Sequence, residues 1–297
     1  MTFVIGAYAV YGSGTPEETA ALVAGLADAG ICDGLEVPFS NGAVSVPSGV
    51  PASWRHVVTM IPGTMMTMAG DPGFGLAATG EGRQAALDMA RTCRDQVAAR
   101  SDILAVEIHS APRRTASADA FAESLAELAG WDWGGASLVV EHCDAWTSEH
   151  AVEKGFLTAE AELDAIASLG STATPVRFGV NWARSVIETR DAATGAEHVR
   201  LASERGLLGG LMFSSVASED SAYGGAWVDA HVPPRGVAGT PESSLLGADE
   251  IAATWAAATL ADGGFAGLKV GLQPATLSPA ERVQRLVATA KLVEQRG

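Results

Sequence analysis

Apolar and polar positions alternate in short runs along much of the chain, and segments with helical periodicity separate most of these runs. Eight runs have the length and the residue types of β-strands. They cover residues 3–8, 34–37, 56–61, 103–109, 137–141, 176–181, 208–213 and 267–271. Strands that alternate with helices predict βαβ units and a parallel sheet.

Two of the intervening helices have clear start signals. Thr15, Pro16 and Glu18 form a capping box with proline at the first helical position, and this helix is expected to end at Gly30. Ser278 begins the same pattern near the end of the chain. Further helical patterns cover about 83–100, 118–129, 158–169, 196–205 and 248–261. The segment 41–53 holds two prolines and two glycines, so the helix after the second strand is predicted to be short or missing.

Eight strands and their helices in 297 residues predict an α/β fold, a single (β/α)8 TIM barrel that spans residues 1–297 as one domain. The alternative is an open doubly wound sheet, which a glycine-rich dinucleotide turn would favour. Gly12 and Gly14 follow the first strand, but the third glycine of that motif is absent, so no nucleotide cofactor is expected. The connection 214–247, after the seventh strand, is the longest. Its length indicates a functional or mobile loop on the catalytic face of a barrel.

Strand periodicity predicts which side chains point into the barrel, because successive residues alternate between its two faces. In the fourth strand, Val106 and Ile108 belong to the apolar face that packs on helices, whereas Glu107 and His109 fall on the inner face. The same argument gives an inward set of Glu36, Glu107, His109, Glu141, Arg177, Asn181 and Lys269. A structural barrel fills its interior with branched apolar residues, and an unpaired buried charge is costly. These groups must therefore pair with one another or line a wet pocket, which indicates a functional site.

Position along each strand separates the roles of these residues. Arg177 lies deeper than the others and is expected to form a buried ion pair with Glu107 or Glu36. Glu141, His109 and Asn181 end their strands, at the catalytic face. For His109 the structural alternative is a core histidine bonded to a loop carbonyl. The structural alternative for Lys269 is a salt bridge to Glu141 with no chemical role.

Other residues near strand ends give weaker signals. His142 and Cys143 follow Glu141 and are candidates for the rim of the pocket. Asp229 and His231, in the long connection, form a candidate metal pair or lid contact, and a solvated loop is the alternative. Tryptophans near strand or loop ends can stack on sugar faces, although buried packing is their commoner use. They are Trp131, Trp133, Trp146, Trp182 and Trp227.

Composition limits the partners. Charged residues make up 18% of the chain, and 19 Lys and Arg against 35 Asp and Glu give a formal net charge of −16. No basic cluster is longer than Arg113 and Arg114, so no nucleic-acid partner is expected. The three cysteines are far apart and lack metal-binding spacing, which indicates a reducing compartment. With no secretory pattern in residues 1–8 and no run of 18 apolar residues, the sequence predicts a cytoplasmic protein with no membrane partner.

Short motifs in three strands resemble the xylose-isomerase-like TIM barrels. They are Gly34, Leu35 and Glu36 in the second strand, Val140, Glu141 and His142 in the fifth, and Gly179, Asn181 and Trp182 in the sixth. That superfamily includes sugar isomerases, ketose epimerases, hydroxypyruvate-isomerase-like proteins and an apurinic endonuclease branch. The similarity extends along the whole chain in strand order, and an uncharacterised branch of about this length, a domain of unknown function, is the best match.

The resemblance implies a divalent metal between the ends of strands five to eight, held by Glu, Asp, His and Glu. Glu141 fits the first position, and Asn181 or a neighbour takes the second. Ser214 or Ser215 stands where the histidine is expected, and Lys269 where the second glutamate is expected. The usual ligand set is therefore not retained. A remodelled site, similar to the Asp-x-His loop of the endonuclease branch, would use Glu141, His109, Asp229 and His231.

The main functional hypothesis is an enzyme that isomerises or epimerises a sugar or a small sugar acid by proton transfer next to a carbonyl, with β-elimination as related chemistry. Glu141 would be the general base, His109 the acid or its partner, and Lys269 the group that stabilises the enolate oxygen. Arg184 and Lys269 could bind an anionic group of the substrate. The predicted substrate-binding set is Glu36, Asn181, Arg184, His142, Ser214, His231 and Trp182.

Two other hypotheses keep the same pocket. One is a glycoside hydrolase or other hydrolase that pairs Glu141 with Glu36 or Glu107, and the separation of the carboxylates would distinguish it. The other is a carbohydrate-binding barrel without catalysis. In each case the expected partner is a small carbohydrate-type molecule, and a homo-oligomer is possible.

Overall fold

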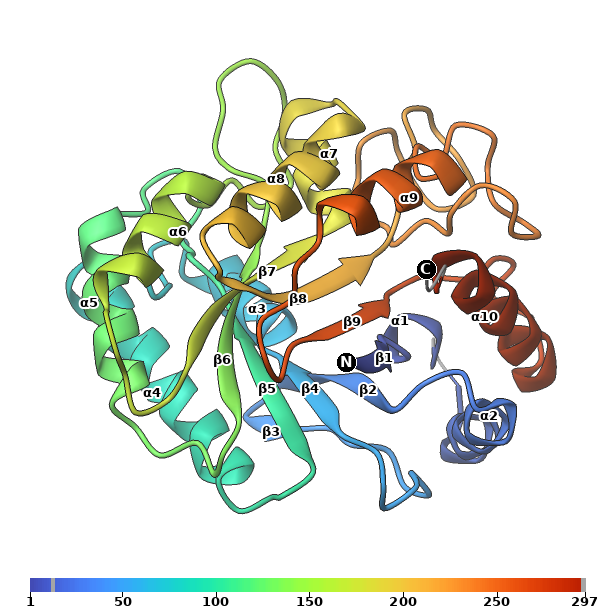
Figure 1. Cartoon of the computed structure of the whole chain (residues 1–297), viewed down its shortest axis with the longest axis horizontal. Helices are drawn as coiled ribbons and strands as arrows, with labels where there is room; N and C mark the ends of the chain where they lie inside the picture. Colours follow the sequence, from blue (N-terminus) through green and yellow to red (C-terminus); the bar gives the residue numbers. More distant parts are fainter. Residues whose placement is uncertain (12–13, 295–297) are drawn as a thin grey trace.

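In the computed structural model of the chain, which describes residues 1–11 and 14–294, eight parallel strands close into a barrel (Figure 1). The strands are β1 (Thr2–Ile5), β2 (Gly34–Ser40), β4 (His56–Thr59), β5 (Ile103–Ile108), β6 (Ser137–His142), β7 (Val176–Asn181), β8 (Leu208–Phe213) and β9 (Phe265–Leu268). β1 pairs with both β2 and β9, which closes the ring. The predicted (β/α)8 barrel is confirmed. The glycine pattern at 12–14 lies partly outside the described residues.

Helices cover the outside of the barrel. α2 (Pro16–Ala29) and α10 (Pro279–Val293) have the predicted capping boxes, and Gly30 ends α2 in the left-handed conformation. Helices at the other predicted places are α4 (Gly80–Val97), α5 (Ala118–Ala129), α6 (Ala159–Ser168), α8 (Ala193–Glu204) and α9 (Ala248–Ala257). Residues 41–55, all of which the structure describes, contain no helix between β2 and β4. A two-residue strand, β3 (Ala43–Val44), pairs antiparallel with β2 there, as the prolines and glycines predicted.

Three helices were not predicted. α1 (Tyr8–Tyr11) takes the end of the expected first strand. α3 (Ile61–Gly70) and α7 (Trp182–Thr189) begin almost directly after β4 and β7, and neither has a side-chain hydrogen bond at its N-cap. Pro62 in the first turn of α3 is a start signal that the sequence reading did not use, whereas α7 has no such signal.

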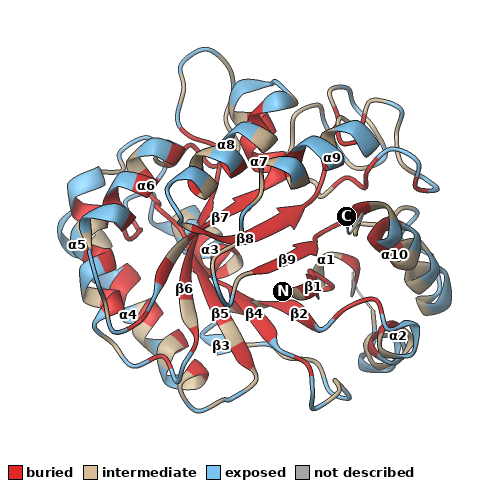
Figure 2. Cartoon of the chain, viewed as in Figure 1, coloured by how far each residue is buried: buried red, intermediate tan, exposed pale blue. Residues whose placement is uncertain are grey.

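The buried apolar residues of the described chain form three clusters, and the smallest consists of Ile61, Ala111, Cys143 and Phe156. The other two build the barrel itself. The larger lies between the strands and the helices, and Figure 2 shows the buried strands inside a ring of helices whose outer faces are exposed. The smaller fills the interior of the barrel with Val4, Val57, Ala105, Val139, Met212 and Phe265. Because this apolar cluster occupies the interior, the inward charged residues lie at the ends of the barrel, and all of them except Arg177 gather at the carboxyl ends of the strands.

The prediction for Arg177 was wrong. Its guanidinium lines a cavity of about 170 Å³ at the amino-terminal end of the barrel, together with Ser137 and Asp262. It donates to the carbonyl of Val176 at 3.3 Å, and no ion pair with Glu107 or Glu36 forms within the described part of the chain. The reason is Gly209, where a Cβ atom would lie 2.4 Å from the Cβ of Arg177, so the arginine stem occupies the space of the missing side chain.

The long connection 214–247 after β8 is present and is well packed. Val216, Val232 and Leu246 are buried, and isolated bridges join Ser215 to Val232 and Ala217 to Ser244. The connection is therefore an ordered cover over one side of the barrel mouth. Among the described helices, none combines the length and the apolar character needed to cross a bilayer.

Candidate active site

Strand periodicity correctly predicts a buried polar group inside the barrel. Glu36 of β2, Glu107 of β5 and Glu141 of β6 each offer a carboxylate oxygen, and these oxygens lie within 4.8 Å of one another. Lys269 lies one residue past β9, and its Nζ atom is 2.7 Å from Oε1 of Glu36 and 3.8 Å from Oε1 of Glu141. All four side chains are buried. The structural alternative for Lys269, a salt bridge to Glu141, is therefore present, with a shorter one to Glu36.

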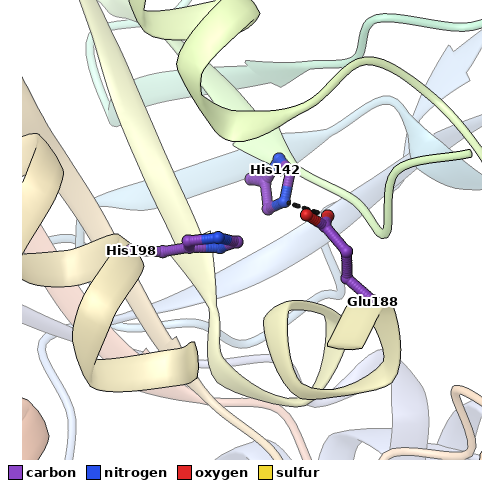
Figure 3. A group of neighbouring side chains, drawn as sticks. All are labelled: His142, Glu188 and His198. Atoms are coloured by element: carbon purple, nitrogen blue, oxygen red, sulfur yellow. Dashed lines mark hydrogen bonds and ion pairs between the residues drawn. The ribbon is translucent and has the colours of Figure 1, made fainter. Parts of the chain in front are cut away.

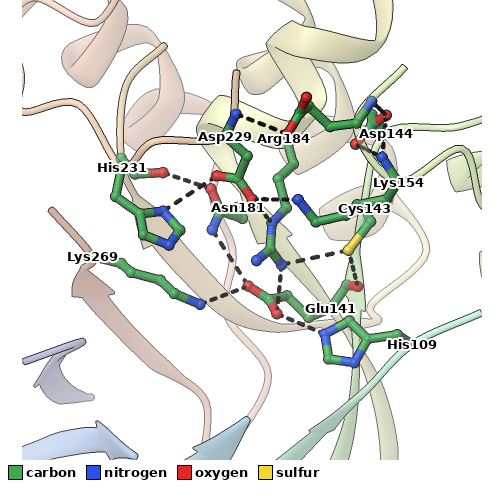
Figure 4. Close-up of polar contacts among 12 residues, drawn as sticks. His109, Glu141, Cys143, Asp144, Lys154, Asn181, Arg184, Asp229, His231 and Lys269 are labelled. Atoms are coloured by element: carbon green, nitrogen blue, oxygen red, sulfur yellow. Dashed lines mark hydrogen bonds and ion pairs between the residues drawn. The ribbon is translucent and has the colours of Figure 1, made fainter. Parts of the chain in front are cut away.

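Glu141 is the centre of this group (Figure 4). Its Oε2 atom accepts from Nε2 of His109 at 2.8 Å and lies 2.7 Å from Nη1 of Arg184. Its Oε1 atom faces Nδ2 of Asn181 at 3.4 Å in addition to Lys269. The side chains come from β5, β6, β7, α7 and the end of β9, so the carboxyl ends of neighbouring strands bring them together, as a parallel barrel requires.

The charges around Glu141 decide its protonation state. Burial alone would raise the pKa of Glu141, but Arg184 and Lys269 outweigh burial and hold the pKa well below its usual range. Burial would lower the pKa of Lys269, but Glu141 and Glu36 outweigh it and hold the pKa well above its usual range. Both groups are therefore charged at neutral pH.

His109 and Glu107 differ from Glu141 and Lys269, because the shifts in their pKa values favour the neutral forms of both side chains. Burial is the largest influence on the pKa of His109 and lowers it to about 4, against the opposing effect of Glu141. Burial, and then the charges of Glu141 and Glu36, raise the pKa of Glu107 well above its usual range. In a neutral His109 whose Nε2–H donates to Glu141, the Nδ1 atom carries a lone pair, and this buried atom has no partner among the described residues.

Arg184 connects this group to two surface connections. Its Nε atom lies 3.0 Å from Oδ2 of Asp229, in the long connection, and the same oxygen is 2.9 Å from Nζ of Lys154. Lys154 lies in the connection after β6, where its backbone N–H donates to Asp144. Burial would raise the pKa of Asp229, but Lys154 and Arg184 hold it well below its usual range. The two connections therefore meet above the barrel through one buried carboxylate.

Four charged or titratable residues meet where the two connections join: Arg184, Lys154, Asp229 and His231. His231 is the most open of them. Its Nδ1 atom is 3.2 Å from Oδ1 of Asp229, and its side chain is 19% exposed. Its backbone has a φ of +53°, in the left-handed region that is unfavourable for residues other than glycine. The carbonyl of His231 accepts from the N–H of Gly271, which ties this part of the long connection to the chain after β9.

The remaining predicted substrate-binding residues fall in three places. Ser214 donates to Oδ1 of Asn181 at 2.8 Å, so it belongs to the inner group. Trp182 is buried in the core outside the barrel, where Gly195 of α8 leaves room for its ring. His142 lies on the helix side of β6, away from Glu141, and bonds to Glu162 and Glu188. Successive residues of a strand point to opposite faces, so Glu141 and His142 cannot share a pocket.

Sequence reasoning missed Tyr8 and Gly6. The Nζ atom of Lys269 lies 5.2 Å from the centre of the Tyr8 ring, within cation–π range. A Cβ atom on Gly6 would be 2.5 Å from Oε2 of Glu36 and 2.8 Å from Cγ of Lys269. Glycine is therefore required where the backbone passes this ion pair. The available signal for Tyr8 was a hydroxyl-bearing side chain at the carboxyl end of the strand predicted over residues 3–8.

The side chains do not fit the divalent metal that the sequence resemblance implied. Both oxygens of Glu141 already face cationic or N–H donors, and the Lys269 ammonium stands between Glu36 and Glu141. The guanidinium of Arg184 separates Glu141 from Asp229, so the remodelled ligand set with His109 and His231 does not converge on one point. The fixed cations supply the positive charge that a metal would bring, and they would repel a metal ion.

A family model described as "Domain of unknown function (DUF4862)" matches residues 4–285. The chain belongs to the DUF4862 family. The chain is similar to the uncharacterized protein STM3670 of Salmonella typhimurium strain LT2, with 38% identity over 194 residues. That match covers 62% of this chain and 60% of STM3670, so the matched region spans less than two thirds of the curated relative.

Solved structures confirm the fold of this DUF4862 chain. The IolI protein, whose crystal structure has a bound zinc atom, is 10% identical with a TM-score of 0.61 over 100% of this chain and 99% of that one. A family 2 AP endonuclease from Brucella melitensis is 14% identical, with a TM-score of 0.56 over 98% and 99% of the two chains. A fusion of a xylose isomerase-like TIM barrel with a 4-hydroxyphenylpyruvate dioxygenase is 14% identical, with a TM-score of 0.55 over 95% of this chain and 41% of that one. At these identities the likeness establishes the TIM-barrel fold alone.

Proposed function

We propose that this barrel isomerises or epimerises a sugar or sugar acid by moving a proton on the carbon next to a carbonyl. The observation that supports this most strongly is the pair formed by His109 and Glu141. The carboxylate holds Nε2–H of the imidazole at 2.8 Å, which leaves Nδ1 as an unpartnered buried lone pair. A neutral imidazole oriented by a carboxylate is a common proton acceptor in enzymes.

The sequence favoured Glu141 as the general base and His109 as the acid or its partner, and this arrangement exchanges the two roles. Glu141 has hydrogen bonds or charge contacts at both oxygens and a lowered pKa, so it is a poor proton acceptor. His109 has the free nitrogen and is the general base in this proposal. Glu141 is then the positioning residue, which fixes the tautomer of His109 and stabilises the imidazolium that forms, as carboxylates do in hydrolytic triads.

Lys269 completes the chemistry of the proposed step. The C–H bond breaks, its proton passes to Nδ1 of His109, and its electron pair forms an enolate whose charge is on the former carbonyl oxygen. An ammonium in a buried site stabilises that charge. Return of the proton from Nδ1 of His109 to the face that it left regenerates the substrate, so the epimer forms only when the enolate turns over in the pocket and takes the proton on its opposite face. The isomer forms when the proton of the neighbouring hydroxyl group moves to the former carbonyl oxygen and the proton on His109 then passes to the neighbouring carbon.

Pairing among the charged groups favours an uncharged sugar over a sugar acid. Lys269 pairs with Glu36, Arg184 with Glu141 and Asp229, and Lys154 with Asp229. A sugar acid would have to displace one of these carboxylates, at the cost of leaving a buried anion unpaired. Hydroxyl groups can instead add hydrogen bonds to groups such as Asn181 without breaking an ion pair.

Substrate entry requires motion of the two connections above the barrel. Glu141, His109, Lys269 and Arg184 are each at most 3% exposed. The ion pair of Lys154 with Asp229 joins the two connections, and His231 lies at the more open side. We infer that this pair separates when substrate enters, which is the gating that many closed active sites use.

The test is solvent-deuterium exchange at the carbon next to the carbonyl, followed by NMR in D₂O. The substrates are a panel of aldoses, ketoses and uronic acids, and the proteins are the wild type, His109→Gln and the exposed control Glu123→Gln. We expect wild type and Glu123→Gln to exchange deuterium into at least one uncharged sugar, and His109→Gln to lose exchange while its circular dichroism spectrum is unchanged.

Other outcomes would contradict the proposal. Exchange that persists in His109→Gln would exclude the histidine as the base. Cleavage of aryl glycosides without exchange would favour the hydrolase, with Glu36, Glu107 and Glu141 as its carboxylates. Binding of sugars across the panel without any turnover would favour the non-catalytic carbohydrate-binding barrel.

A further inference from the structure

The helix side of β6 carries a second buried polar cluster, separate from the group inside the barrel. His142 of β6, Glu188 at the end of α7 and His198 of α8 each offer one ligand atom, and these atoms lie within 4.8 Å of one another (Figure 3). The rings of His142 and His198 meet edge to face, with centroids 4.9 Å apart. None of these three residues takes part in the active site proposed above.

We propose that His142, His198 and Glu188 form a binding site for a divalent transition-metal ion such as Zn²⁺. Two imidazoles and one carboxylate are a ligand set that Zn²⁺, Co²⁺ and Ni²⁺ favour, whereas Mg²⁺ and Ca²⁺ prefer oxygen ligands. Three protein ligands leave a fourth tetrahedral position for water. The Glu188 side chain is 15% exposed, so water can approach the cluster at this edge.

The surroundings of the two histidines match those of metal ligands. The Nδ1 atom of His142 is 2.7 Å from Oε2 of Glu162, and Nδ1 of His198 is 3.0 Å from Oγ of Ser185. Metal-binding histidines usually donate the N–H that does not face the metal to a carboxylate or another acceptor, which fixes the ring orientation. Glu162 is itself held by the Ser110 hydroxyl at 2.5 Å. Both rings therefore have the outer contacts that a metal site requires.

Without a metal, a hydrogen bond spans the proposed position, since Nε2 of His142 is 2.9 Å from Oε2 of Glu188. A contact of this length between an imidazole nitrogen and a carboxylate oxygen holds a proton between the two atoms. Imidazole nitrogens and carboxylates bind metals in their deprotonated forms, so an ion must displace this proton when it binds.

Only small movements are needed to complete the site. Ligand atoms around a tetrahedral ion with bonds of about 2.0–2.2 Å are about 3.3 Å apart. The Nε2–Oε2 separation of His142 and Glu188 must increase slightly from 2.9 Å, and the ligand atom of His198, which lies within 4.8 Å of both, must reach a similar separation. Glu188 stands near the end of α7, and rotation of its side chain gives up one hydrogen bond, which Oε2 accepts from the N–H of Ala145 at 2.7 Å.

The test is calorimetric titration of the untagged full chain with ZnCl₂ after removal of metals with a chelator. We expect one ion per chain, release of about one proton when the titration is repeated in buffers of different ionisation enthalpy, and visible absorption bands of tetrahedral Co²⁺ when CoCl₂ replaces ZnCl₂. His198→Leu should abolish this binding, and Ser185→Ala should weaken it by about 10-fold.

Two variants of residues outside this cluster make the test specific. Cys143→Ser and Glu107→Gln should bind Zn²⁺ as the wild type does. The proposal is overturned if the wild type takes up no stoichiometric Zn²⁺ or if His198→Leu binds it undiminished. It is also overturned if Glu107→Gln loses binding, because the ion would then belong to the carboxylates inside the barrel.

Discussion

Glu141 and His142 are neighbours in sequence, yet the two faces of β6 give them opposite surroundings. Glu141 points into the barrel, where the cations Arg184 and Lys269 and the neutral His109 surround its carboxylate. His142 points toward the helices, where an imidazolium lies between Glu162 and Glu188. One strand therefore holds an anion among cations on one face and a cation among anions on the other.

The two faces of β6 differ in which buried polar atoms lack a hydrogen-bond partner. In the inner group, Nδ1 of His109 is buried without a partner among the described residues, and Oε2 of Glu107 and Oε2 of Glu36 have no partner there except the proton that a neutral Glu107 can share with Glu36. On the helix side, both ring nitrogens of His142 have carboxylate partners. An unmade hydrogen bond in a buried site is costly, so it persists where a ligand can complete it. We therefore assign substrate chemistry to the inner group.

The largest expected effect comes from removing the cation that joins the inner group to the surface connections. Arg184→Leu leaves Glu141 and Asp229 without their shared guanidinium in a buried site. We expect the free energy of unfolding in urea to fall by about 3–5 kcal/mol. The exposed pair of Arg200 and Glu204 is the control, and Arg200→Met should leave stability unchanged. A loss below about 1 kcal/mol for Arg184→Leu would mean that this network does not hold the site together.

Substitution of Lys269 tests whether the inner group performs chemistry. Lys269→Met keeps the length of the side chain and removes the charge assigned to the enolate oxygen. We expect the turnover rate of any substrate found by deuterium exchange to fall by about 10²–10³-fold. Lys291→Met, in an exposed position on α10, is the matched control. A rate within a factor of two of the wild type would leave Lys269 with a structural role only.

The helix-side cluster should affect stability and its dependence on pH. The pKa of His142 is raised to about 10 in the folded chain, from about 6.5 when unfolded. Its contribution to stability is therefore fully present below pH 6.5 and is lost as pH rises toward 10. The loss is on the order of 1 kcal/mol for each pH unit.

Urea unfolding at pH 6 to 10, in the presence of a chelator, measures this effect. His142→Gln should be less stable than the wild type at pH 6, and the difference should shrink as pH rises. A constant difference across the range would show that His142 is not protonated in the folded chain.

A smaller effect is expected in the pH profile of activity. Burial lowers the pKa of His109 to about 4. A histidine base works in its neutral form, so kcat/KM should stay level down to about pH 5 and decline only near pH 4. A decline centred near pH 6.5 would indicate an exposed histidine and would argue against His109. Circular dichroism at each pH separates this loss from unfolding.

Much of the barrel and part of the site could be predicted from the sequence, because strand periodicity is a local property. Glu36, Glu107, Glu141 and Asn181 were placed correctly on the inner face, since their neighbours in the strand are apolar. Helices with capping residues were predicted, whereas α7 was not. The position of α7 is decided by packing against β7 and α8, which no local signal reports.

Contacts made by connections and helices could not be predicted in the same way. The chain of ion pairs from Glu141 through Arg184 and Asp229 to Lys154 joins four segments that are distant in sequence. The direction of Arg177 depends on a missing side chain at Gly209 of a different strand. Long-range geometry of this kind is set by the assembled fold, and a single sequence carries no direct signal for it.

The most direct test of the central claim is the protonation state of the two histidines on either side of the barrel wall. ¹⁵N NMR of the histidine side chains at pH 7, with His109→Gln and His142→Gln used for assignment, reports both rings at once. We predict that His109 shows one protonated nitrogen, Nε2, and one nitrogen with a free lone pair, and that His142 of the metal-free chain shows two protonated nitrogens. A doubly protonated His109 at pH 7 would contradict the account, because the proposed base would then have no lone pair with which to accept a proton.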